Sequence, residues 1–171
     1  RYFWEHDIPV DVITEKQDFS NFKVLVAPML YMLPLAMQER LKAFVAAGGT
    51  LVTTYITGIV DENDLTYLGG WPEIMQEICG VKLGETDTFY PSDTNRITYQ
   101  GQTFEVKDYA ALLTVTDGEV LATYLDDFYQ GTPAVTRHSF GKGRTYVIGA
   151  RTEQAFHEML YNEITEQAGI G

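Results

Sequence analysis

Two short apolar runs in the first third of the chain enclose a segment with helical periodicity. Residues 24–27 (VLVA) and 50–55 (TLVTTY) are typical of strands, and we expect the first to be buried on both faces. Between them, apolar side chains recur on one face of a predicted helix, at Met37, Leu41, Phe44 and Val45. The opposite face carries Gln38, Glu39 and Lys42. Pro34 suits the start of this helix, and Gly48 and Gly49 suit its end, so the segment predicts a right-handed βαβ unit with parallel strands.

The rest of the chain predicts further strands and helices around this unit. The expected elements are strands at 10–13 and 119–124, short helical segments at 72–78 and 108–113, an antiparallel hairpin of 132–140 and 144–149, and a final helix at 153–167. Residues 81–106 alternate β-like segments with turn residues, so we expect a small β-rich insertion there, in the form of a flap. The sum is an α/β domain with a mostly parallel sheet, an antiparallel edge hairpin and helices on both faces.

The composition narrows the class of protein. The 171 residues suit one domain, and 45% of them are hydrophobic, which is enough for a core. A formal net charge of −12 makes the chain a poor candidate for binding nucleic acid or an anionic membrane. No apolar run approaches the roughly 20 residues of a membrane span. A single cysteine fits a reducing compartment, so we expect a cytoplasmic protein.

Side chains for nucleophilic or metal chemistry occur in the sequence without the spacing that such chemistry requires. Ser20, Ser92 and Ser139 lie in no G-x-S-x-G elbow, and the apolar neighbours of Cys79 favour a buried structural thiol. The three histidines are scattered outside any metal-binding motif: His6, His138 and His157. Residues 141–144 (GKGR) lie between two predicted strands, which favours a hairpin turn over a phosphate-binding loop. We therefore expect no metal and no cofactor.

One loop after the second predicted strand concentrates hydrogen-bonding side chains. Asp61, Glu62 and Asp64 bring three carboxylates together, and a glycosidase needs two carboxyl groups about 5–10 Å apart. Catalytic pairs usually come from separate elements of a deep pocket, so a solvated or partner-bound acidic loop is the favoured interpretation. Open α/β sheets bind ligands at the carboxyl ends of their strands. The candidates for facing a partner or a sugar are Tyr55, Thr57, Asp61, Glu62, Asn63, Asp64 and Tyr67.

Several long blocks of the sequence point to one family. They are residues 23–33 (KVLVAPMLYML), 43–55 (AFVAAGGTLVTTY), 57–65 (TGIVDENDL), 68–72 (LGGWP), 120–151 (VLATYLDDFYQGTPAVTRHSFGKGRTYVIGAR) and the early PVDVI at 9–13. In this order they closely resemble the middle domain of glycoside hydrolase family 42 β-galactosidases. The resemblance runs from about Pro9 to the final helix and so covers nearly the whole chain.

The resemblance implies a fold and a role. The family's middle domain is a flavodoxin-like, class I glutamine amidotransferase-like three-layer sandwich that follows a TIM barrel with two catalytic glutamates. By this resemblance residues 1–8 are the tail of a linker from the barrel, residues 9–171 are a trimerisation domain, and the chain holds no catalytic residue. The parent would be a homotrimer that hydrolyses terminal β-D-galactosides with retention. Residues 57–65 are then expected against the barrel of a neighbouring subunit or at its active-site mouth, while the chain's own barrel is a second partner.

Two alternatives from other functional classes stay open at this point. An independent amidotransferase-like enzyme would need a nucleophile on a strand-to-helix elbow, and the sequence offers none. A galactoside-binding module would need a stacking platform of aromatic side chains, although aromatics are more often core or interface residues. The aromatic candidates for such a platform are Tyr67, Trp71, Phe89, Tyr90, Phe128 and Tyr129.

Overall fold

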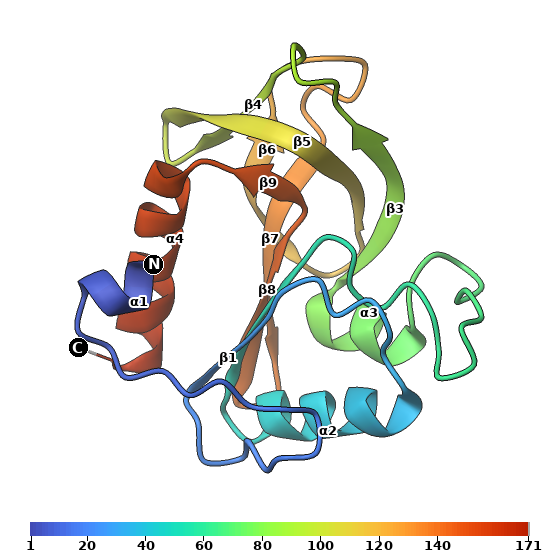
Figure 1. Ribbon diagram of the computed structural model, residues 1–171, viewed down its shortest axis with the longest axis vertical. Coiled ribbons are helices and arrows are strands. Elements are labelled where there is room, and N and C mark those ends of the chain that lie inside the picture. Colours follow the sequence, from blue (N-terminus) through green and yellow to red (C-terminus); the bar gives the residue numbers. More distant parts are fainter. Residues whose placement is uncertain (171) are drawn as a thin grey trace.

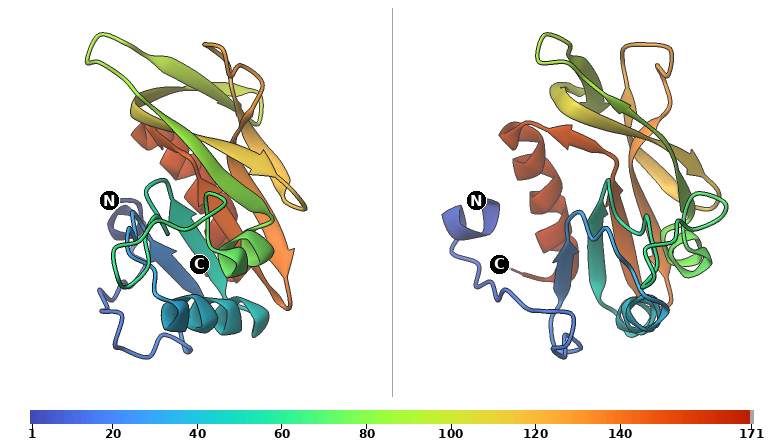
Figure 2. Two further views of the ribbon diagram at one scale, coloured as in Figure 1. Left: turned by 90° about the vertical axis from the view of Figure 1, so that its right-hand side faces the viewer. Right: turned by 45° about the vertical axis from the view of Figure 1, so that its right-hand side comes forward.

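The computed structural model describes residues 1–170 and places one mixed sheet between two layers of helices (Figures 1 and 2). Within that range the helices are α1 (Tyr2–Glu5), α2 (Leu35–Ala46), α3 (Glu73–Cys79) and α4 (Gln154–Ala168). The strands are β1 (Val24–Ala27), β2 (Thr50–Thr54), β3 (Val81–Thr88), β4 (Asn95–Tyr99), β5 (Gln102–Val115), β6 (Glu119–Tyr124), β7 (Pro133–Phe140), β8 (Gly143–Ile148) and β9 (Ala150–Thr152). The expected α/β class, with helices on both faces, is confirmed.

Parallel pairing is confined to one side of the sheet. The strand order is β1-β2-β8-β7-β6-β4-β5-β3, and β9 pairs with β5. Strands β1, β2 and β8 are parallel, and the remaining named pairs are antiparallel. The parallel part is therefore smaller than the sequence predicted, because the strands of 81–115 join the same sheet instead of forming a separate flap. The β-rich character expected for 81–106 is present in β3, β4 and the start of β5.

The βαβ unit and the hairpin are confirmed. β1 and β2 pair in parallel, and α2 connects them along the chain. β7 and β8 pair antiparallel and are connected by the glycine turn. Helix α2 ends as its sequence predicts, since Gly48 adopts a φ of 119° and the N–H of Gly49 donates to the carbonyl of Phe44. One assignment on this helix is wrong: Gln38 is only 3% exposed, although helical periodicity placed it on the polar face. Burial of its amide is tolerated because the Nε2 group has two hydrogen-bond partners, described below.

Three further expectations are corrected by the structure. Residues 10–13 form no strand, and the side chains of Val10 and Val12 are exposed. As a result β1 is an edge strand, so residues 24–27 are half-buried instead of fully buried. Residues 108–113 lie inside β5 and are not helical; the turn signal there reflects Asp108, whose φ of 65° interrupts the regular register.

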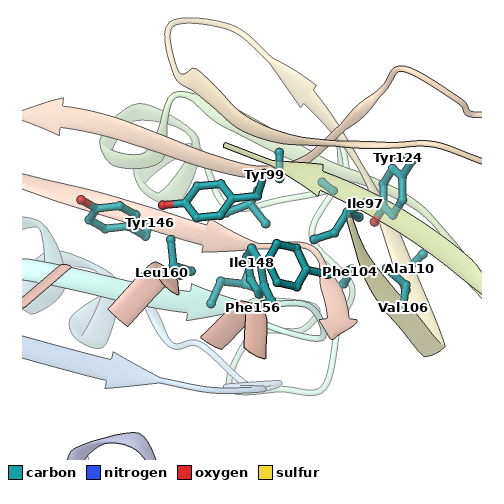
Figure 3. Packing of buried hydrophobic residues seen from close by; sticks show 14 of the residues in the cluster. Ile97, Tyr99, Phe104, Val106, Ala110, Tyr124, Tyr146, Ile148, Phe156 and Leu160 are labelled. Atoms are coloured by element: carbon teal, nitrogen blue, oxygen red, sulfur yellow. The ribbon is translucent and has the colours of Figure 1, made fainter. Parts of the chain in front are cut away.

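Each face of the sheet has its own hydrophobic core. On one face, Phe156 of α4 meets Tyr99 and Phe104 edge to face, with ring centroids 5.5 Å and 5.6 Å away (Figure 3). On the other face, α2 and α3 cover Leu51 and Val147. Neighbouring residues along β2 and β8 thus point to opposite cores, as strand geometry requires. Among residues 1–170, no helix has the length and apolarity needed to cross a membrane.

Candidate functional site

The loops that follow β1 and β2 are joined into one unit at the carboxyl ends of these parallel strands. The N–H of Gly58 donates to the carbonyl of Leu30 over 2.9 Å, and the N–H of Ile59 donates to Tyr31 over 2.9 Å. The N–H of Leu33 returns a bond to the carbonyl of Val60 at 3.0 Å. Sequence reasoning singled out the second loop alone, because it could not see that the first loop pairs with it.

Two threonine hydroxyls fasten the first loop to the end of β2. Thr54 Oγ1 accepts a hydrogen bond from the N–H of Met29 at 2.8 Å, and Thr57 Oγ1 accepts one from the N–H of Leu30 at 3.2 Å. Thr57 is buried, and its carbonyl accepts a bond from the indole N–H of Trp71 at 2.8 Å. The predicted site residue Thr57 therefore helps to shape the two loops in the single chain.

Two residues with large apolar side chains adopt a strained backbone conformation in the same two loops. Met29 and Ile56 have φ values of 48° and 58°, in the left-handed region that L-residues with large side chains avoid. Each such residue costs about 1–2 kcal/mol, and strain of this kind persists where the surrounding structure over-determines the conformation and where function uses it. Nothing in the sequence signals either position.

The carboxylate of Asp61 accepts hydrogen bonds from the backbone of the turn that Asp61 begins. Asp61 Oδ1 accepts hydrogen bonds from the N–H of Asn63 at 2.8 Å and from the N–H of Leu65 at 3.0 Å. Within residues 1–170, the side chains of Glu62, Asn63 and Asp64 make no hydrogen bond or ion pair, and all three are exposed. The acidic loop thus presents three polar side chains outward on a turn that Asp61 holds.

Tyr67 ties the far end of the loop to helix α2. Its hydroxyl donates to the carbonyl of Leu33 at 2.6 Å and accepts a bond from Gln38 Nε2 at 2.8 Å. Gln38 Nε2 also donates to the same carbonyl at 2.9 Å. Burial is the main reason that the pKa of Tyr67 is raised, so this phenol stays a neutral donor.

Tyr55 lies apart from the acidic loop, against the long strand β5. Its ring packs on that of Tyr109 with centroids 5.0 Å apart, and burial raises its pKa. Close by, Arg151 Nη1 lies 2.8 Å from Asp108 Oδ2. The structure therefore brings six of the seven predicted residues into one pair of loops and places Tyr55 at their base.

Exposed apolar side chains occur on the same two loops as the acidic residues. Six of them lie on the two joined loops and the first residue of α2, and we call them the apolar rim: Met29, Tyr31, Met32, Leu35, Leu65 and Leu68. Leu68 is 98% exposed. A group of exposed apolar side chains on two joined loops is typical of an interaction site. Sequence reasoning missed this surface, although the run MLYML between two prolines could have indicated it, since a loop that faces water alone has no need of these residues.

Two titratable groups outside these loops have pKa values shifted by burial. Cys79 is buried, and burial raises the pKa of its thiol to about 12, which confirms a structural cysteine. His157 is half-buried, and its partial desolvation lowers its pKa. The described residues contain no cluster of three or more His, Cys, Asp or Glu side chains placed to hold a metal ion.

The aromatic residues considered for sugar stacking do not form one platform. Trp71 and Tyr129 are buried, Tyr67 is committed to helix α2, and Phe89 packs against a core. Only Tyr90 and Phe128 are exposed among the six candidates. Their exposure alone supplies no concave, hydrogen-bonding sugar site.

Comparison with known proteins identifies the family. The family described as the beta-galactosidase trimerisation domain matches residues 1–171. The chain belongs to this family. It is 52% identical to β-galactosidase GalA of Bacillus licheniformis over 170 residues, which are 99% of this chain and 25% of that protein. It is 55% identical to GanA of Bacillus subtilis over 161 residues, which are 94% of this chain and 24% of that protein.

A solved structure agrees with the assignment. Gan42B, a family 42 β-galactosidase from G. stearothermophilus, superimposes with a TM-score of 0.96 at 52% identity, covering 98% of this chain and 25% of that one. The chain thus spans about a quarter of the length of the relatives it matches.

Proposed function

We propose that this chain assembles the subunits of a homotrimeric, retaining β-galactosidase and carries no catalytic residue of its own. The match to the trimerisation family over residues 1–171 carries the proposal. The β-galactosidase relatives, of which this chain spans about a quarter, support the parent activity. In the proposal the two carboxyl groups that cleave terminal β-D-galactosides, one as nucleophile and one as acid/base, lie outside the chain.

The apolar rim is the proposed contact surface. Its six residues are exposed in the single chain, and burying them against a neighbour would remove apolar area from water. A closed ring of three subunits joins two different surfaces of identical chains, so the rim meets another part of the neighbouring subunit, which we take to be its TIM barrel. Glu62, Asn63 and Asp64 supply polar contacts at the edge of this interface, while Thr57, Asp61 and Tyr67 hold the loop in shape.

The finer organisation of the chain belongs to the same proposal. The parallel unit β1-α2-β2 with β8 supports a relationship to flavodoxin-like and class I glutamine amidotransferase-like sandwiches. Residues 81–106 are then an insertion into that fold, residues 1–8 are the end of a linker from the barrel, and residues 9–171 are the assembly domain. The parent enzyme is proposed to work in the cytoplasm, without a cofactor.

Charge removal on the acidic loop tests its place in the interface. In the full-length enzyme, Glu62→Gln with Asp64→Asn keeps the shape of both side chains and leaves the turn-holding Asp61 intact. We expect the trimer to dissociate at a protein concentration about tenfold higher than for the unchanged enzyme. Because the dissociation constant of a trimer scales with the square of the concentration, this shift is equivalent to about 2.7 kcal/mol per trimer. The matched control is Glu85→Gln with Asp93→Asn, which removes two exposed carboxylates elsewhere. A loop variant that stays as trimeric and as active as the control contradicts the assignment of the loop.

The isolated chain separates the assembly role from catalysis. We expect residues 1–171 alone to hydrolyse no β-galactoside, since the proposal places both catalytic carboxyl groups outside them. Measurable hydrolysis by the purified chain would contradict the proposal as a whole.

A further inference from the structure

Several Lys and Arg side chains that make no ion pair lie close together on this acidic protein. The chain has 12 Lys and Arg residues against 24 Asp and Glu. Within residues 1–170, six of these cations make no ion pair: Lys16, Lys23, Arg40, Lys82, Lys142 and Arg144. Four of the six line a single groove of about 800 Å³: Lys23, Arg40, Lys142 and Arg144. The groove lies at the amino ends of β1, β2 and β8, and therefore opposite the apolar rim.

Neutral oxygen atoms hold three of the four cations in place. Arg144 Nη1 donates to Gln167 Oε1 at 3.0 Å, and Lys23 Nζ donates to the carbonyl of Gly169 at 3.1 Å. The guanidinium of Arg40 donates to the carbonyls of residues 15 and 17 and lies 4.4 Å from the ring centroid of Phe19. These contacts orient the side chains without forming an ion pair, so an anion in the groove would find them already positioned. Asp18 is the acidic side chain near them: its pKa is lowered by hydrogen bonds from Ser20 and also by the charge of Arg40.

The turn that carries Lys142 and Arg144 is packed tightly against the end of helix α2. The N–H of Lys142 donates to the carbonyl of Ala46 at 3.0 Å, and the N–H of Arg144 donates to Gly49 at 3.2 Å. Gly143 fits because it has no Cβ, which would lie 2.2 Å from the carbonyl oxygens of Val45 and Gly49. Lys142 and Arg144 are therefore carried by a turn that is held in a fixed position at the side of the groove.

Hydroxyl groups that can donate hydrogen bonds also line the groove. Ser20, Thr50 and Ser139 contribute hydroxyl groups to its lining. Asp18 is the only carboxylate among the lining residues, and its Oδ1 accepts the N–H of Ser20 at 2.9 Å. Guanidinium, ammonium and hydroxyl donors facing one space are the recognition chemistry of multivalent oxyanions.

We propose that this groove is a binding site for a multivalent oxyanion of the phosphate class. The positive groove stands out from a chain whose net charge of −12 disfavours anions elsewhere. A concave space with fixed donors suits a small, highly charged ligand, whereas an acidic protein segment is more often met by a flat, mobile patch. The site lies away from the rim, so it stands whether or not the rim mediates assembly.

Titration with inorganic phosphate and with pyrophosphate tests the site. Amide signals of the labelled chain are followed by NMR at constant ionic strength set with chloride, and we expect saturable shifts at residues 20, 23, 48–49 and 142–144. In the variant Lys142→Glu with Arg144→Glu the affinity should fall about tenfold or more, because two attractive charges become repulsive. Lys23→Glu, on a separate element, should weaken binding in the same direction and guards against a folding defect in the double variant.

The matched control is Lys82→Glu with Lys107→Glu, which reverses two exposed cations on β3 and β5. Its affinity should stay within about twofold of the unchanged chain, since these charges lie outside the groove and are screened by salt. Equal affinity in the groove variant and the control would overturn the proposal. Binding of a glutamate-rich peptide in the groove without binding of either phosphate would overturn it too, because the ligand would then be an acidic polypeptide.

Discussion

The hydroxyl of Thr54, the last residue of β2, accepts a 2.8 Å hydrogen bond from the backbone N–H of Met29 in the loop after β1. Met29 sits there with a φ of 48° and is 53% exposed. An unfavourable backbone conformation is thus held by a specific bond, and it directs a large apolar side chain toward solvent. In the proposed trimer that side chain is part of the interface, which is a reason for keeping the strain.

Replacing Met29 by glycine should separate stability from assembly. Glycine adopts a positive φ freely, so relief of strain outweighs the added chain entropy, and the free energy of unfolding should rise by about 0.5 kcal/mol. The same change removes an apolar rim side chain, so the trimer of the full-length enzyme should weaken. Urea unfolding of the chain and light scattering of the enzyme measure the two effects.

Met32→Gly is the matched control for this prediction. Met32 is 45% exposed in the same loop but lacks a positive φ, and it bridges to Val60. Glycine there should lower the free energy of unfolding by about 1 kcal/mol. If the two glycine variants changed stability in the same direction, strain at Met29 would not be the explanation.

Tyr67→Phe should destabilise the chain by about 1–2 kcal/mol, because it removes the hydroxyl that bridges the carbonyl of Leu33 and the buried amide of Gln38. The measurement is the free energy of urea unfolding. Tyr90→Phe provides the comparison, since the hydroxyl of Tyr90 makes no hydrogen bond within residues 1–170 and its side chain is 78% exposed. A loss no greater than that of Tyr90→Phe would mean that the Tyr67 hydroxyl does not hold the loop.

The thiol of Cys79 should not react with thiol reagents in the folded chain. It is buried, and its raised pKa of about 12 leaves almost no thiolate at neutral pH. A disulfide reagent at pH 8 should therefore modify one thiol per chain in denaturant and modify none on the same timescale without it. Rapid modification of the native chain would contradict the assignment of Cys79 as a core residue.

The free energy of unfolding should decrease at alkaline pH, because buried groups have raised pKa values in the folded chain. Burial raises the pKa of Cys79 from 9.0 to about 12 and that of Tyr161 from 10.0 to about 12. Between these values the folded chain holds protons that the unfolded chain has released, so the free energy of unfolding is fully retained below pH 9 and decreases from pH 9 toward 12. Unfolding curves at pH 8, 9.5 and 10.5 should show this decline, with a shallower slope in Cys79→Ala. A rise in stability over this range would be the opposite sign and would refute the account.

The sequence predicted the elements whose local signals agree with their surroundings. The βαβ unit, the hairpin around the 141–143 turn and the final helix each combine periodicity with suitable end residues. Residues 10–13 resemble a strand in sequence but pair with no other strand. The side chains of Val10 and Val12 are exposed, so no burial favours such pairing. Residues 108–113 were predicted as a short helical segment, whereas pairing with β3 and β9 keeps the chain extended there and Asp108 only bends β5.

The candidate site was predicted in part for similar reasons. Loop 57–65 stood out as a polar segment without a local structural duty, and the structure assigns such a duty to Asp61 and Thr57. The burial of Gln38 depends on Tyr67, which is 29 residues away along the chain, so helical periodicity alone could not reveal it. The positive φ of Met29 likewise goes with a hydrogen bond to Thr54, which is 25 residues away along the chain, so the residues next to Met29 do not reveal it.

The mass of the full-length enzyme in solution, measured with a disrupted rim, tests the central claim most directly. The rim variant Met32→Lys, Leu65→Lys, Leu68→Lys is compared with Tyr90→Lys, Val120→Lys, Phe128→Lys, which places the same three charges on exposed apolar positions elsewhere. Light scattering across a concentration series should give a trimer for the control and a single subunit for the rim variant, because charged groups resist burial in an apolar contact. A rim variant that remains as trimeric as the control would contradict the account.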